Sequence, residues 1–192
     1  MKKIKIQTTA LLKPFKYHNQ IRENLLLKIN NAYSDKLNVK DDYIYDEIDR
    51  LDFSKSSDYY SREWVQLVKP KLEEHFNECA KDLNYQICTL HNIWYQQYSI
   101  NNTHGWHTHG ENYTGVYYLQ FPKGSPKTEL IDQYNIRKKI TINAKEGDIV
   151  IFPSFIVHRA PKVLLNIKKT IISFNLQFDF INPDVLPTIN SL

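Results

Sequence analysis

The sequence predicts a mainly β protein of the α+β class, an antiparallel sandwich or barrel with helices on the outer face of one sheet. Two observations predict it. All five glycines lie in the second half of the 192-residue chain, so the first half lacks the residue that tight turns favour. After about residue 85 the chain consists of short runs rich in β-branched and aromatic residues, separated by turn residues, which is the pattern of antiparallel strands.

The first half carries two apolar stripes at helical spacing. The first stripe recurs at every fourth residue and consists of Ile21, Leu25, Ile29 and Tyr33. The second predicts a helix over residues 61–84 and consists of Val65, Val68, Leu72, Phe76 and Leu83. Pro70 lies inside this second stripe, where it is expected to kink the helix or to split off its first turns. The polar segment between the stripes, residues 45–61, is expected to be a long loop.

The strands are expected mainly in the second half of the chain. The N-terminal run, residues 1–15, is basic and then mildly apolar, which is typical of a first strand rather than a signal peptide. The other candidate strands are residues 86–100, 113–121, 127–132, 138–143, 148–152 and 168–180. We therefore expect a single domain over residues 1–192, with a helix-rich N-terminal support at 1–85 and the β core at 86–182.

Composition excludes several classes of protein. A hydrophobic content of 42% is that of a globular chain, and the apolar stretches fall short of the roughly 20 residues that a membrane span requires. The net charge of +4 is mild and no dense Lys/Arg block is present, so a peptidyl or small-molecule substrate is favoured over nucleic acid. The two cysteines do not resemble a disulfide scaffold, which favours a reduced, cytoplasmic setting.

The histidines form a pattern that predicts a metal site. His107 and His109 are two positions apart, so in an extended segment both side chains point to the same side. His158 follows a buried strand and a Pro153 turn, which places it at the start of another strand as a third imidazole. Imidazole suits iron, copper, nickel or zinc. His104 is out of phase with the pair and is expected to lie in a loop.

Residues 94–175 resemble the core of the 2-oxoglutarate/Fe(II)-dependent oxygenases, and more narrowly a bacterial and phage branch related to prolyl hydroxylases. The resemblance rests on the sequences HTH at 107–109, TGVYY at 114–118, GDIVIFP at 147–153 followed by His158, and Lys169 leading to SFN at 173–175. It implies a double-stranded β-helix (jelly-roll) core. It also implies an enzyme that uses Fe(II), 2-oxoglutarate and O2 to couple oxidative decarboxylation of 2-oxoglutarate to hydroxylation of a substrate C–H bond.

The resemblance implies a role for individual residues. His107 and His158 would be iron ligands, with His109 at the second ligand position, and Lys169 would bind the remote carboxylate of 2-oxoglutarate. Lys168 is the rival, but strand alternation puts Lys169 on the same face as Ser173 and Asn175, a polar inward set, and Ser173 is assigned to the co-substrate site with Lys169. Tyr118 and Tyr98 resemble two family tyrosines that bind the same co-substrate.

The pattern departs from the family at one ligand and leaves alternatives open. Most members have a carboxylate where this chain has His109, and Glu111 offers a shifted H-x-E motif with His109 in which His107 would lie behind the ligands. A three-histidine metalloprotein of the cupin type, which would not use 2-oxoglutarate, also fits the spacing from Gly147 to His158. A jelly-roll binding protein without catalytic activity is the third alternative.

Overall fold

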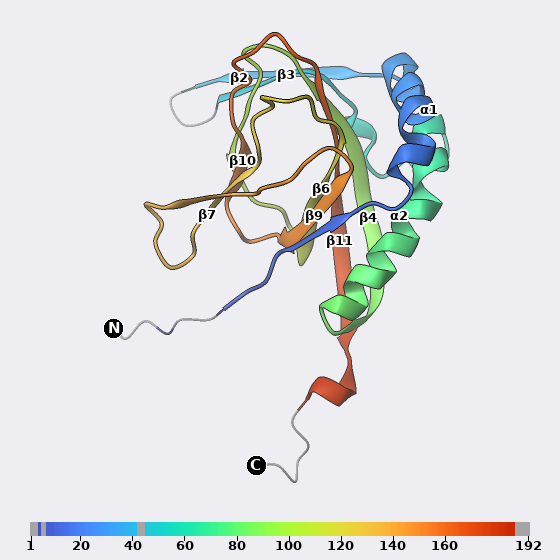
Figure 1. The fold of residues 1–192 in the computed structure, drawn as a ribbon, viewed down its shortest axis with the longest axis vertical. Helices are drawn as coiled ribbons and strands as arrows, with labels where there is room; N and C mark the ends of the chain where they lie inside the picture. The colour runs from blue at the N-terminus through green and yellow to red at the C-terminus, as the bar shows by residue number, and fades with distance from the viewer. Residues whose placement is uncertain (1–3, 5–6, 42–44, 187–192) are drawn as a thin grey trace.

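The computed structural model describes residue 4 and residues 7–41 and 45–186 of the chain (Figure 1). The helices of this part are α1 (His18–Asn31) and α2 (Glu63–Asp82), with short 3₁₀ turns η1 (Phe53–Lys55) and η2 (Pro183–Val185). Its strands are β1 (Leu11–Pro14), β2 (Asp35–Lys40), β3 (Tyr45–Leu51), β4 (Tyr85–Tyr98), β5 (His104–His107), β6 (Tyr113–Gln120), β7 (Glu129–Ile131), β8 (Lys139–Thr141), β9 (Asp148–Pro153), β10 (His158–Ala160) and β11 (Lys169–Ile181).

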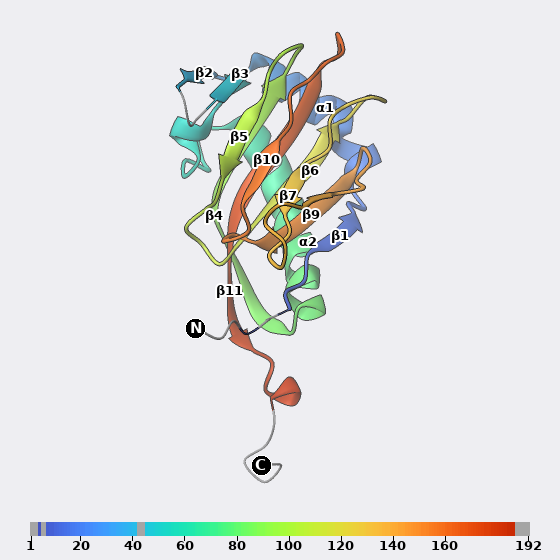
Figure 2. The ribbon, with the colours of Figure 1, turned by 90° about the vertical axis from the view of Figure 1, so that its left-hand side faces the viewer.

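Among the described residues, the strands form two antiparallel sheets. The major sheet has seven strands in the order β1-β9-β6-β11-β4-β3-β2, and the minor sheet has four in the order β5-β10-β7-β8. The minor sheet lies in front of the major sheet in Figure 2, while α1 and α2 cover the other face of the major sheet in Figure 1. This is the layout of a jelly roll with helices on one sheet, which confirms the predicted fold class.

Because the major sheet is covered on both faces, its central strands are apolar on both sides. Tyr117 and Tyr118 are neighbours on β6, and both are fully buried. Tyr117 belongs to the apolar cluster shared with the helices, whereas Tyr118 belongs to the cluster between the sheets. The same alternation on β11 directs Ile172 toward the helices and Ile171 toward the minor sheet.

The two predicted helices are present, with one difference at the proline. Helix α1 buries Ile21, Leu25 and Ile29, and Tyr33 lies beyond its end. Helix α2 runs without a break through Pro70, so the predicted splitting of the first turns was wrong. Its apolar face is fully buried on both sides of Pro70, and that burial maintains the helix despite the missing N–H donor.

The predicted loop at residues 45–61 was wrong. This segment contains β3 and η1, and β3 pairs with β2 on one side and with β4 on the other. Of β3 only Ile48 and Leu51 are buried, and a spacing of three does not produce the alternation by which a strand is found in a sequence. Its pairing partners, which lie far apart in the sequence, determine its conformation.

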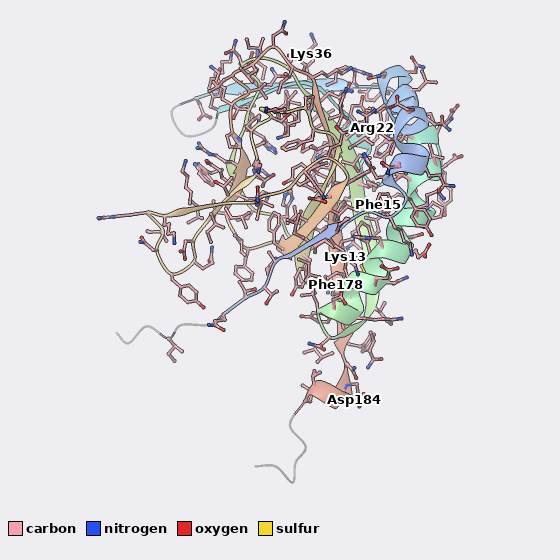
Figure 3. All side chains as sticks on the ribbon, in the orientation of Figure 1. Lys13, Phe15, Arg22, Lys36, Phe178 and Asp184 are labelled. Carbon is pink, nitrogen blue, oxygen red and sulfur yellow. The ribbon has the colours of Figure 1, made fainter. Side chains whose placement is uncertain are left out.

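The opposite edge of the major sheet is anchored to the helices. β1 pairs with β9, and Phe15, directly after β1, is buried against His75 and Tyr117 (Figure 3). Arg22 reaches from α1 toward the sheet in Figure 3, where its Nε donates to Glu146 Oε1 at 2.7 Å. Part of the predicted N-terminal strand, residues 1–3 and 5–6, lies outside the described residues. Neither helix in the described part combines the length and apolar character that crossing a membrane requires.

Candidate metal centre

Three histidines converge where the minor sheet meets the interior. Each of His107, His109 and His158 offers a ligand nitrogen, and these atoms all lie within 4.8 Å of one another. The antiparallel register of β5 with β10 places His107 directly opposite His158. His109 lies beyond the end of β5, where its backbone N donates to Ser154 O at 3.2 Å. The predicted set of three imidazoles is therefore brought together in space.

The hydrogen bonds of two of these rings orient them for metal binding. His107 Nδ1 lies 2.8 Å from Gly105 O, and His158 Nδ1 lies 2.9 Å from Ile156 O. A carbonyl oxygen only accepts, so Nδ1 carries the proton in both rings. The lone pair is then on Nε2, which is the nitrogen left free to bind a metal.

Burial keeps the three imidazoles neutral, the form that binds metals. It lowers the pKa of His158 to about 3 and that of His109 to about 4, with a smaller lowering from the neighbouring His107 charge. Burial also lowers the pKa of His107, against the opposing effects of the Gly105 hydrogen bond and the Asp46 charge. The imidazoles are thus ready to bind a metal ion at neutral pH without first losing a proton.

Glu111 does not join this group. Among the residues that the structure describes, the converging ligand atoms come from the three histidines alone. A centre built on them has neutral ligands throughout, unlike the common arrangement of two histidines and one carboxylate.

Lys169 is a buried cation that fits a carboxylate ligand. It is fully buried on β11, and its Nζ donates to Pro126 O at 3.0 Å. Among the described residues it forms no ion pair, and burial lowers the pKa of its ammonium to about 7. A buried ammonium with one carbonyl partner has unused donors, which the remote carboxylate of 2-oxoglutarate would satisfy. Lys168 points to the other face, where its Nζ donates to Asn30 Oδ1.

Tyr98 links this lysine to the histidines. It is the cross-strand partner of Lys169, whose Nζ lies 5.0 Å from the centre of its ring. Its side chain lines the same pocket as the three histidines. The buried hydroxyl has no hydrogen-bond partner among the described residues, so it is free to bind a ligand that enters the pocket.

The other two predicted co-substrate residues already have partners. Tyr118 donates from its hydroxyl to Thr128 Oγ1 at 2.8 Å, and Ser173 Oγ donates to Gln96 Oε1 at 3.1 Å. Thr128, Gln96 and Ser173 all line the pocket. Thr128, in the loop before β7, and Gln96, on β4, were not identified from the sequence, because a single polar residue carries no signal of its own.

A glycine allows the strands around the pocket to approach closely. A Cβ added to Gly115 would lie 2.3 Å from Val150 O and 2.5 Å from Phe174 Cε2. Glycine at the second position of the TGVYY motif is therefore required by packing between β6, β9 and β11.

The prediction that His104 lies in a loop was wrong. His104 begins β5, and its ring stacks on that of His107 with centroids 3.9 Å apart and planes at 23°. Strand alternation, which put His104 out of phase with His107, failed because β5 contains a bulge. His104 and His107 are three residues apart on β5, but their partners Ala160 and His158 are two residues apart on β10. A bulge in a four-residue strand has no signature that a sequence pattern reveals.

Comparison with known proteins relates this segment of the chain to a family. Residues 92–175 match the family model described as "Putative 2OG-Fe(II) oxygenase". The matched segment runs from β4 to β11 and includes the three histidines, Lys169 and Tyr98. A search of curated proteins found no significant match.

Solved structures of low sequence identity share the fold. A 2OG-Fe(II) oxygenase family oxidoreductase from Burkholderia pseudomallei has a TM-score of 0.68 at 9% identity, over 88% of this chain and 84% of that chain. A prolyl hydroxylase from Trichoplax adhaerens, in complex with a hypoxia inducible factor peptide fragment, has a TM-score of 0.59 at 15% identity, over 86% of this chain and 83% of that chain. HygX from Streptomyces hygroscopicus, with nickel, 2-oxoglutarate and hygromycin B bound, has a TM-score of 0.61 at 10% identity, over 90% and 84%.

The family match favours an oxygenase over a cupin-type metalloprotein and over a binding protein without activity. The family uses Fe(II), 2-oxoglutarate and O2. The described pocket offers three imidazoles for the metal, and the buried ammonium of Lys169, beside the pocket residue Tyr98, fits the co-substrate. Over residues 92–175 the chain is similar to the 2-oxoglutarate/Fe(II)-dependent oxygenases, and solved structures of that family share its fold.

Proposed function

We propose that the chain binds one Fe(II) through His107, His109 and His158 and hydroxylates a peptidyl or small-molecule substrate. We assign the co-substrate site to Lys169, Tyr98, Tyr118 and Ser173. One observation carries the proposal: three neutral imidazoles converge in a pocket that also contains Tyr98, and beside Tyr98 lies the buried ammonium of Lys169.

When bound, Fe(II) and 2-oxoglutarate supply the oxidising chemistry, in which O2 and 2-oxoglutarate yield succinate, CO2 and a hydroxylated substrate. The residues of the chain bind and orient. Lys169 would donate charge-assisted hydrogen bonds to the remote carboxylate, and the Tyr98 hydroxyl would donate a further one. Thr128 holds the Tyr118 hydroxyl at the pocket wall.

Aromatic side chains suggest where the substrate enters. Trp94 lines the pocket, and its ring lies 5.8 Å from that of His109. Phe53 of η1 contacts Trp94 edge-on at 5.0 Å and is half exposed. This supports a substrate that approaches over residues 53–62, with an apolar group against the two rings. The peptide in the Trichoplax complex and the hygromycin B in the HygX complex exemplify the two substrate classes that we propose.

The N-terminal half is proposed to work with the core as one domain over residues 1–192, with residues 1–85 supporting the core at 86–182. Strands β1, β2 and β3 join the major sheet, which supports this assignment. Free Cys79 and Cys88 support a reducing, cytoplasmic setting.

Succinate formation tests the proposed function. Anaerobically purified protein is loaded with Fe(II) and given 2-oxoglutarate and air, and succinate is measured by mass spectrometry. We expect succinate even without substrate, through uncoupled turnover, and none from the His158→Ala variant. Iron-loaded protein that forms no succinate would argue against the proposal.

The identity of the second ligand is tested separately. His109→Ala is expected to lose stoichiometric iron, whereas Glu111→Gln is expected to keep it, because Glu111 lies outside the converging group of described residues. Iron analysis of both variants decides between the three-histidine ligand set and the shifted H-x-E motif. Loss of iron in Glu111→Gln with retention in His109→Ala would establish the shifted H-x-E motif instead.

A further inference from the structure

A bulge in β5 brings a fourth imidazole to the metal centre from a position that strand alternation would direct elsewhere. The extra residue re-aims His104, whose ring then lies flat on His107 at 3.9 Å. His104 lines the same pocket as the three histidines. Bulges next to active sites redirect side chains in this way. The His104 ring behind His107 is therefore a candidate for a role in the metal centre.

The bulge is anchored by a carboxylate from outside the family-matched segment. Asp46 Oδ1, on β3, accepts a hydrogen bond from Gly105 N at 2.6 Å. The carbonyl of the same residue, Gly105, accepts from His107 Nδ1 at 2.8 Å. A single residue therefore connects the Asp46 carboxylate to the metal-facing ring of His107. Metal-binding histidines commonly donate to a carboxylate or a carbonyl, and here the carbonyl is itself positioned by a carboxylate.

The surrounding contacts fix this arrangement. β3 is tied to the start of β5 by paired backbone hydrogen bonds between Glu47 and Thr103, at 2.9 and 2.8 Å. A Cβ added to Gly105 would lie 3.3 Å from Tyr45 O and 3.4 Å from Asp46 Oδ1, so the strands meet closely at this point. The position of Asp46 relative to His107 is thus set by backbone contacts rather than by a mobile side chain.

His104 is held between the same carboxylate and Gln96. Its Nε2 lies 3.9 Å from Asp46 Oδ1, and its Nδ1 lies 3.4 Å from Gln96 Nε2. Because Gln96 Oε1 accepts from Ser173, its amide nitrogen faces His104 as a donor. The proton of His104 is then on Nε2, toward Asp46. This ring forms a flat support against which His107 rests.

We propose that Asp46 is a positioning residue of the metal centre: through the Gly105 backbone and the His104 ring it orients His107, and it supplies the negative charge that a three-histidine ligand set lacks. The inference rests on the proposed function. It assigns to the N-terminal β2–β3 hairpin, outside residues 92–175, a supporting part in the metal site.

The test is metal affinity rather than turnover. Co(II) binding is measured by calorimetry on the full chain for wild type, Asp46→Asn and Glu47→Gln. Glu47 is the matched control, because it is the next residue of β3 and its carboxylate faces Lys40 and Tyr45 instead of the pocket. Asp46→Asn keeps an oxygen for Gly105 N and removes the charge. We expect it to weaken Co(II) binding roughly 10- to 100-fold, with Glu47→Gln within about twofold of wild type.

A second readout separates the effect of the charge from a merely structural effect. Removal of a negative charge disfavours the ferric state, so Asp46→Asn is expected to raise the Fe(III)/Fe(II) potential, and Glu47→Gln is expected not to change it. His104→Ala should weaken Co(II) binding, whereas His104→Phe, which keeps a flat ring, should restore most of it.

The outcomes separate the inference from the proposed function. Wild-type affinity and potential in Asp46→Asn, with Co(II) binding lost in His107→Ala, would overturn the role of Asp46 alone. Wild-type protein that binds no Co(II) would overturn both. An Asp46→Asn variant that fails to fold leaves the two His104 variants to decide, and equal affinity in His104→Ala and wild type would then contradict the inference.

Discussion

At the scale of single residues, two buried polar groups in or beside the pocket have fewer hydrogen bonds than they can form. Lys169 is fully buried with a carbonyl oxygen as its hydrogen-bond partner, and Tyr98 has a buried hydroxyl without one among the described residues. Burying such groups costs free energy unless a ligand satisfies them. The sequence identified both residues only through resemblance to a family, because thirteen tyrosines offer no way to single out Tyr98 by composition.

Replacement of Lys169 tests the co-substrate site. Lys169→Met removes the ammonium while filling similar space, and we expect 2-oxoglutarate binding to weaken roughly 10- to 100-fold, the loss of charge-assisted hydrogen bonds. Calorimetric titration of the metal-loaded protein measures it. Lys168→Met is the matched control, since Lys168 donates to Asn30 on the helix side. Equal losses in both variants would contradict the assignment.

Lys169 also predicts a pH dependence of stability in the ligand-free protein. Burial lowers the pKa of its ammonium from 10.5 to about 7, so between these values the unfolded chain holds a proton that the folded chain has released. The free energy of unfolding should therefore rise with pH across this window and be lowest below about pH 7. Denaturant titrations at several pH values measure the rise, and Lys169→Met should flatten it. If the free energy of unfolding rises with pH equally in the variant, titration of other groups causes the rise.

At the scale of elements, strand alternation correctly predicted which side chains face inward on regular strands, and it failed where a strand is irregular. The choice of Lys169 over Lys168 as the inward side chain followed from period-two alternation along β11, and the structure agrees. His104 was misplaced because one extra residue in β5 inverts that alternation. β3 was missed because its buried residues do not alternate, so pairing with distant strands determines it.

Two glycines provide a test of strand packing. Gly115→Ala places a Cβ 2.3 Å from Val150 O, which is backbone and cannot move aside without parting β6 from β9. We expect a loss of about 3 kcal/mol in the free energy of unfolding. Gly110→Ala is the control, because an added Cβ there meets nothing within 4 Å. Thermal melting of both variants measures the difference, and similar melting temperatures would contradict the packing argument.

At the scale of the whole molecule, the N-terminal half of the chain adds strands β1, β2 and β3 to the major sheet of the jelly roll. The sequence predicted the helices, most strands and the three-histidine set, since these depend on local patterns and a distinctive motif. It did not predict that β3 contacts the bulged strand β5 through Asp46, because that contact joins residues 59 positions apart. Contacts of this kind depend on how the sheets assemble rather than on any local pattern.

Metal binding should stabilise the whole fold, since the ligands come from two strands of the minor sheet, β5 and β10, and from the loop that follows β5. At a Ni(II) concentration one hundred times its dissociation constant, the expected stabilisation is about 2.7 kcal/mol. Thermal melting with and without Ni(II) measures it, and a chelator should reverse it. His158→Ala should show no shift, and a shift of wild-type size in that variant would place the metal elsewhere.

The central claim is that the three imidazoles and Lys169 form one site for Fe(II) and 2-oxoglutarate. Its most direct test is an anaerobic titration of 2-oxoglutarate into Fe(II)-loaded protein, followed by visible absorption. We expect a charge-transfer band that requires both components, saturates at one equivalent of iron, is absent in His158→Ala and needs a higher 2-oxoglutarate concentration in Lys169→Met. Iron bound at one equivalent with no band at any 2-oxoglutarate concentration would contradict the claim.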